Sequence, residues 1–130
     1  MKRRLWITLL ACVCLIGCAC QNGMKKNTPE AATEAFAKAF YSGDFTHMYQ
    51  YASKKSQIVI KTMQDGMKGQ TERLEAMRNA KIEFESITVE DQTDSTATST
   101  TNTLIDGKPL IGKWDLVKED GQWKVTMVMP

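Results

Sequence analysis

The chain has 130 residues, enough for one domain of ordinary size and a short leader. Its composition, with 42% hydrophobic and 25% charged residues, is that of a soluble globular protein. The net charge of +2 includes Lys2, Arg3 and Arg4 at the extreme N-terminus, so 14 basic residues (17 − 3) face 15 acidic ones in the remainder. That remainder has no basic patch with interleaved aromatic residues, which argues against a nucleic acid partner.

Residues 1–17 have the layout of a signal peptide. The three cationic residues precede an apolar stretch from Leu5 to Gly17, as in secretory leaders. Thirteen helical residues span only about 20 Å, less than the roughly 30 Å of a hydrocarbon core. A removed signal is therefore favoured over a permanent transmembrane helix.

The stretch ends in Leu15-Ile16-Gly17-Cys18, which resembles the bacterial lipobox. The resemblance implies cleavage after Gly17, a diacylglycerol thioether on Cys18 and acylation of the new amine. An ordinary secretory signal with a coincidental cysteine is the alternative. Two or more acyl chains would anchor the protein stably, because each buried methylene contributes about 0.8 kcal/mol. We therefore expect an exported protein, anchored to a bacterial membrane of the cell envelope with its domain outside the cytoplasm.

The cysteines indicate how the remainder is organised. All four lie between Cys12 and Cys20, so the body has no disulfide framework and its fold depends on its core. Residues 18–27 are polar and without periodicity, which predicts a short lipidated tether. Residues 28–130 are expected to form the domain.

The first half of the domain is predicted to be helical. Thr28 can cap a helix and Pro29 suits its first turn, while apolar residues recur at helical spacing until Gly43 ends it. Asp44 begins a second helix, and a third helical region is predicted over 53–79. Gly66 and Gly69 weaken the third region and can divide it in two.

The second half changes to a period of two, which predicts strands at about 81–90, 95–105, 109–118 and 122–129. The dipeptides Asp106-Gly107 and Asp120-Gly121 are strong signals for two-residue hairpin turns. The Thr-rich run 93–103 could instead be disordered or glycosylated, but threonine favours strands.

The turns fix which residues should face each other. Asp120-Gly121 places Leu116 opposite Val125 and Trp114 opposite Met127. Asp106-Gly107 places Trp114 opposite Ser99 and Leu116 opposite Ala97.

A third turn at Gln92-Thr93 would place Thr101 opposite Phe84. One face then collects apolar and small residues without titratable side chains, and should meet the helices. Its members are Ile82, Phe84, Ser86, Ala97, Ser99, Thr101, Leu110, Gly112, Trp114, Leu116, Trp123, Val125, Met127 and Met129.

The segments TPEAATEAFAKAFYSGDF (28–45) and GKWDLVKEDGQWKV (112–125) resemble those of small bacterial lipoproteins carrying the domain of unknown function DUF4878, which is also labelled a lumazine-binding domain. The resemblance covers residues 28–129. It implies an α+β fold, the NTF2-like cone, in which N-terminal helices pack on one face of a curved four-stranded antiparallel meander.

Candidate site residues are few. NTF2-like cones often hold a pocket between sheet and helices, and Trp114, Trp123 and Tyr49 are the candidates to line one here, although the two tryptophans also suit a core. A titratable group would have to come from the helices, where Asp44 and His47 could pair, or Asp44 could simply cap its helix. Tyr41 and Tyr51 are further candidates. No catalytic residue is assigned.

The sequence thus predicts no cofactor, and no metal site because His47 is the lone histidine. Two functions remain: a non-enzymatic module that binds a small molecule or a protein, and a small-molecule enzyme of the ketosteroid-isomerase kind. Besides the membrane and this unknown ligand or partner, the chain is compatible with a homodimer.

Overall fold

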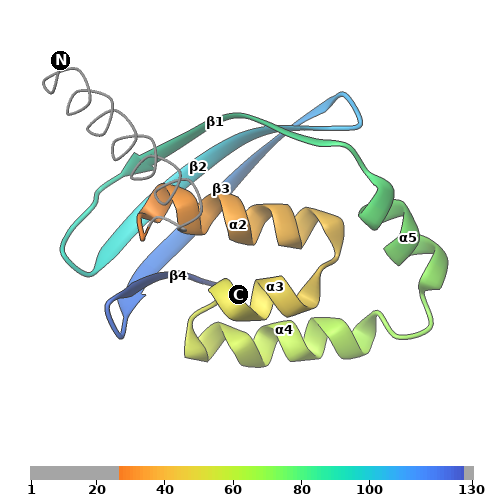
Figure 1. Cartoon of the computed structure of the whole chain (residues 1–130), viewed down its shortest axis with the longest axis horizontal. Coiled ribbons are helices and arrows are strands. Elements are labelled where there is room, and N and C mark those ends of the chain that lie inside the picture. Colours follow the sequence, from red (N-terminus) through yellow and green to blue (C-terminus); the bar gives the residue numbers. More distant parts are fainter. Residues whose placement is uncertain (1–26, 128–130) are drawn as a thin grey trace, which may run out of the picture.

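The computed structural model describes residues 27–127, so the predicted signal peptide, Cys18, most of the tether and Met129 lie outside the described residues. Within the described residues, four helices precede four strands (Figure 1). They are α2 (Pro29–Ser42), α3 (Phe45–Tyr51), α4 (Lys54–Gly66), α5 (Thr71–Asn79), β1 (Ile82–Glu90), β2 (Thr96–Ile105), β3 (Lys108–Glu119) and β4 (Gln122–Thr126).

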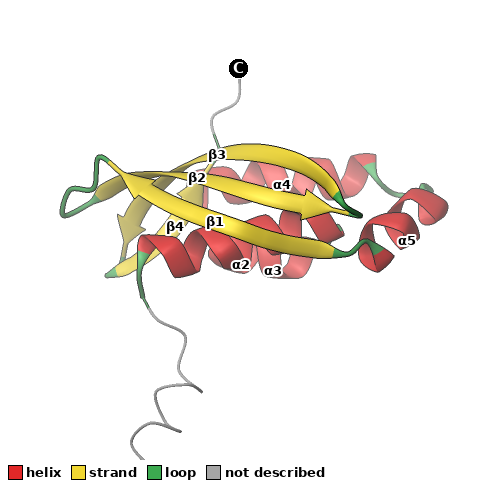
Figure 2. Cartoon of the chain, turned by 90° about the horizontal axis from the view of Figure 1, so that it is seen from above, coloured by secondary structure: helices red, strands yellow, loops and turns green. Residues whose placement is uncertain are grey.

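The strands form one antiparallel sheet in the order β1-β2-β3-β4, and the helices lie in a layer on one of its faces (Figure 2). The predicted α+β fold, helices against one side of a curved meander, is confirmed. We call the side of the sheet that meets the helices the inner face. Within residues 27–127 no helix is both long enough and apolar enough to cross a membrane.

The helix ends follow from local hydrogen bonding. The Thr28 hydroxyl accepts from the backbone N–H of Ala31 at 3.2 Å, and Gly43 ends α2 with a left-handed φ of 70°. The region predicted as one helix over 53–79 is divided into α4 and α5. Gly69 lies in the connection between them and has a φ of 85°. A left-handed conformation of this kind interrupts a helix.

The two pairings governed by Asp-Gly turns are as predicted. Leu116 pairs with Val125, and Ser99 pairs with Trp114. Both residues of each turn have positive φ angles, 50° and 80° at residues 106 and 107 and 51° and 76° at 120 and 121. Such turns match the twist of the flanking strands, so each one determines the register of the two strands that it joins. The β3–β4 ladder ends at Asp115 and Thr126, one position before the predicted pairing of Trp114 with Met127.

The predicted pairing of β1 with β2 is wrong. Thr101 pairs with Ile87, and Phe84 pairs with Thr103. The strands are joined by five residues (91–95), and β1 has a bulge between Phe84 and Ser86 that holds one extra residue. The bulge reverses the alternation, so Ser86 points to the outer face, where its hydroxyl accepts from Asn102 Nδ2 at 2.8 Å.

The inner face also differs from prediction at its ends. Lys118 and Lys108 are two residues beyond Leu116 and Leu110 on β3, so alternation places them on the inner side. The expectation that this face has no titratable side chain is therefore wrong at its margins.

The core lies between α2, α3, α4 and the half of the sheet that contains β4. Its largest fully buried apolar side chains are those of Phe36, Met48, Ile60, Leu116 and Val125. By contrast, α5 has no buried residue, and Leu110 on the inner face of β3 is 44% exposed. The helices therefore leave this end of the inner face partly open.

Candidate functional site

Trp114 belongs to an aromatic cluster between α2 and the inner face. Its ring meets those of Phe36, Phe40 and Tyr41 edge to face, with centroid separations of 5.7, 5.6 and 6.1 Å. This arrangement is favourable because the positive edge of one ring meets the negative face of another. Phe36 is fully buried and Trp114 is half-buried, so Trp114 packs chiefly as part of the core.

A hydrogen bond connects this cluster to the sheet. Trp114 Nε1 donates to Thr101 Oγ1 at 3.0 Å, and the Tyr41 hydroxyl lies beside the same atoms above Gly112. Because an indole N–H can only donate, the Thr101 hydroxyl retains its own proton and can donate it to a neighbouring oxygen. Burial raises the pKa of the Tyr41 phenol, so this group remains protonated at neutral pH.

Gly112 on β3 gives these groups the room to converge. A Cβ atom at this position would lie 2.8 Å from Tyr41 Oη, 2.9 Å from Thr101 Oγ1 and 2.9 Å from Trp114 Nε1. All three separations are shorter than real Cβ contacts. The glycine therefore allows polar atoms from α2, β2 and β3 to meet above the sheet.

The next inner residue of β2 has an unsatisfied hydroxyl. Thr103 is 1% exposed, and its Oγ1 has no hydrogen-bond partner among the described residues. Leaving a buried hydroxyl unpaired costs about 1–3 kcal/mol. The Thr103 hydroxyl is therefore an uncompensated polar group beneath the inner face, next to Thr101 on the same strand.

A separate groove lies at the other end of the domain and encloses about 480 Å³. One wall is the face of α2 from Thr28 to Lys38, and the opposite wall is the beginning of β4 from Gln122 to Lys124. Gln50 and Tyr51, at the end of α3, complete it. This volume is in the range of small-molecule sites, which are about 300–1,000 Å³.

The wall formed by β4 is held in place by Asn27. The Asn27 carboxamide accepts from the backbone N–H of Trp123 at 3.0 Å and donates to the carbonyl of Gly121 at 2.6 Å. Trp123 is 6% exposed, and Lys118 Nζ lies 5.7 Å from its ring centroid. The residue at which the described chain begins thus joins α2 to the last hairpin and lines the groove as well.

The other predicted site residues lie elsewhere. Tyr49 packs against the core, with Lys61 Nζ 5.4 Å from its ring centroid, and its carbonyl accepts from Gln57 Nε2. It does not line the groove. Trp114 and Trp123 are both on the inner face but belong to different sites, so the structure does not bring the three predicted residues together.

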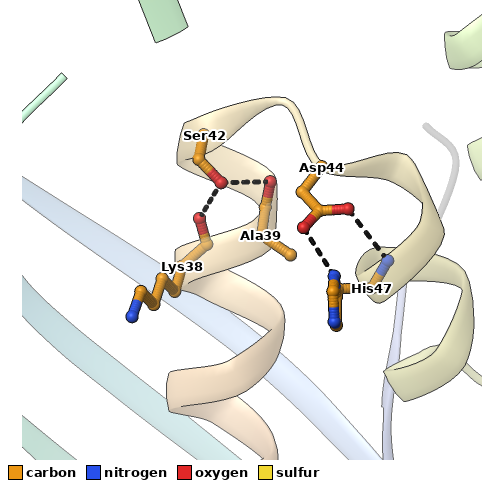
Figure 3. A network of polar contacts seen from close by, with 5 residues as sticks. All are labelled: Lys38, Ala39, Ser42, Asp44 and His47. Carbon is orange, nitrogen blue, oxygen red and sulfur yellow. Dashed lines mark hydrogen bonds and ion pairs between the residues drawn. The ribbon is translucent and has the colours of Figure 1, made fainter. Parts of the chain in front are cut away.

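Asp44 and His47 form a local pair at the start of α3 (Figure 3). One carboxylate oxygen of Asp44 accepts from the backbone N–H of His47 at 3.2 Å, and the other oxygen lies 2.5 Å from the imidazole Nδ1 of His47. The capping role of Asp44 is confirmed. The His47 side chain is 56% exposed and does not line the groove. Among residues 27–127, no cluster of three or more His, Cys, Asp or Glu could hold a metal ion.

The sequence analysis did not predict the cluster of polar atoms around Thr101 and Gly112, the buried hydroxyl of Thr103, or the groove. Gly112 carried a signal, because a glycine inside a strand often marks a close approach by other atoms. The groove carried none, since its walls are about 90 residues apart in the chain.

Comparison with solved structures supports the fold class. The chain is similar to a crystal structure from Campylobacter jejuni that is described as an NTF2-like transpeptidase. The two superpose with a TM-score of 0.54 at 22% sequence identity. The match covers 78% of this chain and 99% of that chain. It shows that the fold is NTF2-like.

Comparison with family models identifies the family. Residues 22–126 match the family described as "Domain of unknown function (DUF4878)", so the chain belongs to this family. Comparison with curated proteins gave no match.

Proposed function

We propose that this protein is an exported, lipid-anchored binding module that holds a ligand in the groove between α2, α3 and β4 without transforming it. The observation that carries the binding role is the groove itself, about 480 Å³ between walls that hydrogen bonds fix in place. The lipid anchor is supported by the lipobox at residues 15–18.

The groove suits retention because its walls are already organised. Lys124 Nζ donates to the Gln50 carbonyl at 2.7 Å, and Asn27 joins the base of α2 to Gly121 and Trp123. Walls fixed before binding lose little conformational entropy when a ligand arrives, which favours affinity.

The position of the groove fits an anchored protein. Asn27, which lines the groove, lies nine residues after Cys18. Nine residues span at most about 30 Å, so a lipid on Cys18 would hold the groove end of the domain near the bilayer.

Native mass spectrometry tests the proposal, using the full chain recovered from its own host's membranes. Ala35 lies on the α2 wall, so Ala35→Trp should fill the groove. Glu72→Trp on the exposed helix α5 is the matched control. We expect acyl mass on Cys18 in all three proteins, and a bound molecule in the wild type and Glu72→Trp but not in Ala35→Trp.

Thermal melting of each variant separates a filled groove from a failed fold. An unmodified Cys18 would refute the anchor. A bound mass that persists in a folded Ala35→Trp protein would refute the groove as the binding site.

A second candidate function is a small-molecule enzyme acting at the open end of the inner face. The observation that favours it is the position of the Tyr41 hydroxyl beside Thr101 Oγ1 and Trp114 Nε1, from which it can donate to a substrate carbonyl. In that case the bound molecule would persist in Ala35→Trp and would be lost in Tyr41→Phe.

A further inference from the structure

The groove has a charge opposite to that of the domain. Residues 27–127 contain 12 Lys and Arg against 15 Asp and Glu, a net charge of −3. The groove lining has two lysines, Lys38 and Lys124, and one carboxylate, Glu34, a net charge of +1. A concave site with a net charge of one sign concentrates ligands of the opposite sign.

The two lysines lie on opposite walls. Lys38 comes from α2 and Lys124 from β4. The Lys124 ammonium is directed by its bond of 2.7 Å to the Gln50 carbonyl. An ammonium group has three donors, so this bond leaves two for a ligand. A single anionic group in the groove could thus be approached by cations from both sides.

The remaining lining is suited to an apolar body. Ala31 and Ala35 give the α2 wall small apolar side chains, and Tyr51 and Trp123 are the aromatic residues of the lining. Asn27, Gln50 and Gln122 add amides at the margins. Orientation by a few polar groups on a mainly apolar surface is typical of small-molecule sites.

We propose that the ligand of this groove is a small organic anion with an apolar body, its carboxylate or phosphate held between Lys38 and Lys124. The inference rests on the proposed binding function and specifies its ligand class. Glu34 opposes this binding, because it lies one helical turn before Lys38 on the same wall and partly neutralises it. Such an anion has two sources near a membrane, a soluble metabolite and the headgroup of an anionic lipid.

Three isosteric probes test the charge preference: 4-phenylbutyrate, neutral 4-phenylbutanol and cationic 4-phenylbutylamine. Their binding to the full chain in phosphatidylcholine nanodiscs is measured by calorimetry, with empty nanodiscs subtracted. We expect 4-phenylbutyrate to bind about 4–25-fold more tightly than either analogue, since two surface cations each contribute about 2–5-fold. Equal binding of the three probes would overturn the proposal.

Variants distinguish a charge contact from a structural role. Lys38→Gln and Lys124→Gln should each weaken 4-phenylbutyrate binding about 2–5-fold, and Glu34→Gln should strengthen it by a similar factor. Binding of 4-phenylbutanol should not change in Lys38→Gln or Glu34→Gln, whereas Lys124→Gln also removes the bond to the Gln50 carbonyl and should weaken binding of both probes. Lys113→Gln, on the exposed outer face of β3, is the control and should bind as the wild type does. Weaker binding in Glu34→Gln would contradict the proposal.

Nanodiscs that contain phosphatidylglycerol identify the source. If phosphatidylglycerol competes with 4-phenylbutyrate, and Lys38→Gln weakens that competition, the anion is the lipid headgroup. If phosphatidylglycerol does not compete, the anion is a soluble molecule. The test also separates this inference from the proposed function. If a molecule copurifies with the wild type but not with Ala35→Trp, and the probes show no charge preference, only the ligand class is wrong.

Discussion

Replacement of Gly112 by alanine tests the packing of the inner polar cluster. The new Cβ would lie within 3.0 Å of Tyr41 Oη, Thr101 Oγ1 and Trp114 Nε1. Two of these atoms form a hydrogen bond of 3.0 Å, so neither can retreat without lengthening that bond. Overpacking of this kind costs about 1–3 kcal/mol.

The same substitution also reduces the entropy of the unfolded chain, which stabilises by about 0.4–1 kcal/mol where the backbone is compatible. The φ of Gly112 is not left-handed, so this gain applies. We therefore expect Gly112→Ala to lower the free energy of unfolding by about 1–2 kcal/mol, measured by urea denaturation followed through tryptophan fluorescence.

Gly66→Ala is the matched control. Gly66 is the last residue of α4, and a Cβ there would have no atom within 4 Å. Because alanine has the higher helix propensity, this variant should be more stable than the wild type by about 0.5–1 kcal/mol.

A double mutant isolates the cause. Tyr41→Phe removes the oxygen nearest to the new Cβ, so Gly112→Ala should cost at least about 0.5 kcal/mol less in that background. If Gly112→Ala is as stabilising as Gly66→Ala, or if its cost is unchanged by Tyr41→Phe, then the three polar atoms do not converge as described.

Three further predictions concern stability and anchoring. Trp114→Ala should lower the free energy of unfolding by about 3 kcal/mol, the lower end of the range for buried aromatic residues, because this side chain is half-buried. Lys113→Ala, on the outer face, should lower it by under about 0.5 kcal/mol. If urea denaturation shows Lys113→Ala to be the less stable of the two, the register is contradicted. Asn27→Ala should cost about 1–2 kcal/mol, because it removes two hydrogen bonds to the last hairpin, and an unchanged melt would show that the clamp contributes nothing. Cys18→Ser should release the protein from membranes or stall its processing, and continued partition into detergent would contradict the lipid anchor.

The accuracy of the sequence-based register depended on the turns. At Asp106-Gly107 and Asp120-Gly121 the two residues can adopt only a narrow set of conformations that join strands, so the pairings of Trp114 and Leu116 followed directly. The connection from β1 to β2 has no such dipeptide, and a two-residue turn at Gln92-Thr93 was the wrong assumption.

The bulge in β1 was also readable in part. Ile82 and Phe84 occupy even positions, whereas Ile87 and Val89 occupy odd ones, and a change of parity within one strand indicates an extra residue. The site was less predictable. The convergence on Gly112 depends on where α2 crosses the sheet, and the groove depends on Asn27 reaching Trp123, and neither contact leaves a periodic pattern.

The Asn27 clamp also bears on how copies of the protein behave when crowded. A strand at the margin of a sheet exposes unpaired backbone groups that can recruit another chain. At the margin formed by β4 and the turn before it, three of these groups are already occupied: the Asn27 carboxamide pairs with the Gly121 carbonyl and the Trp123 N–H, and the Ser53 N–H donates to the Val125 carbonyl at 2.9 Å. Copies held in the plane of a bilayer by lipid chains would meet at high local concentration, and the occupied groups make this margin a poorer template for their polymerisation.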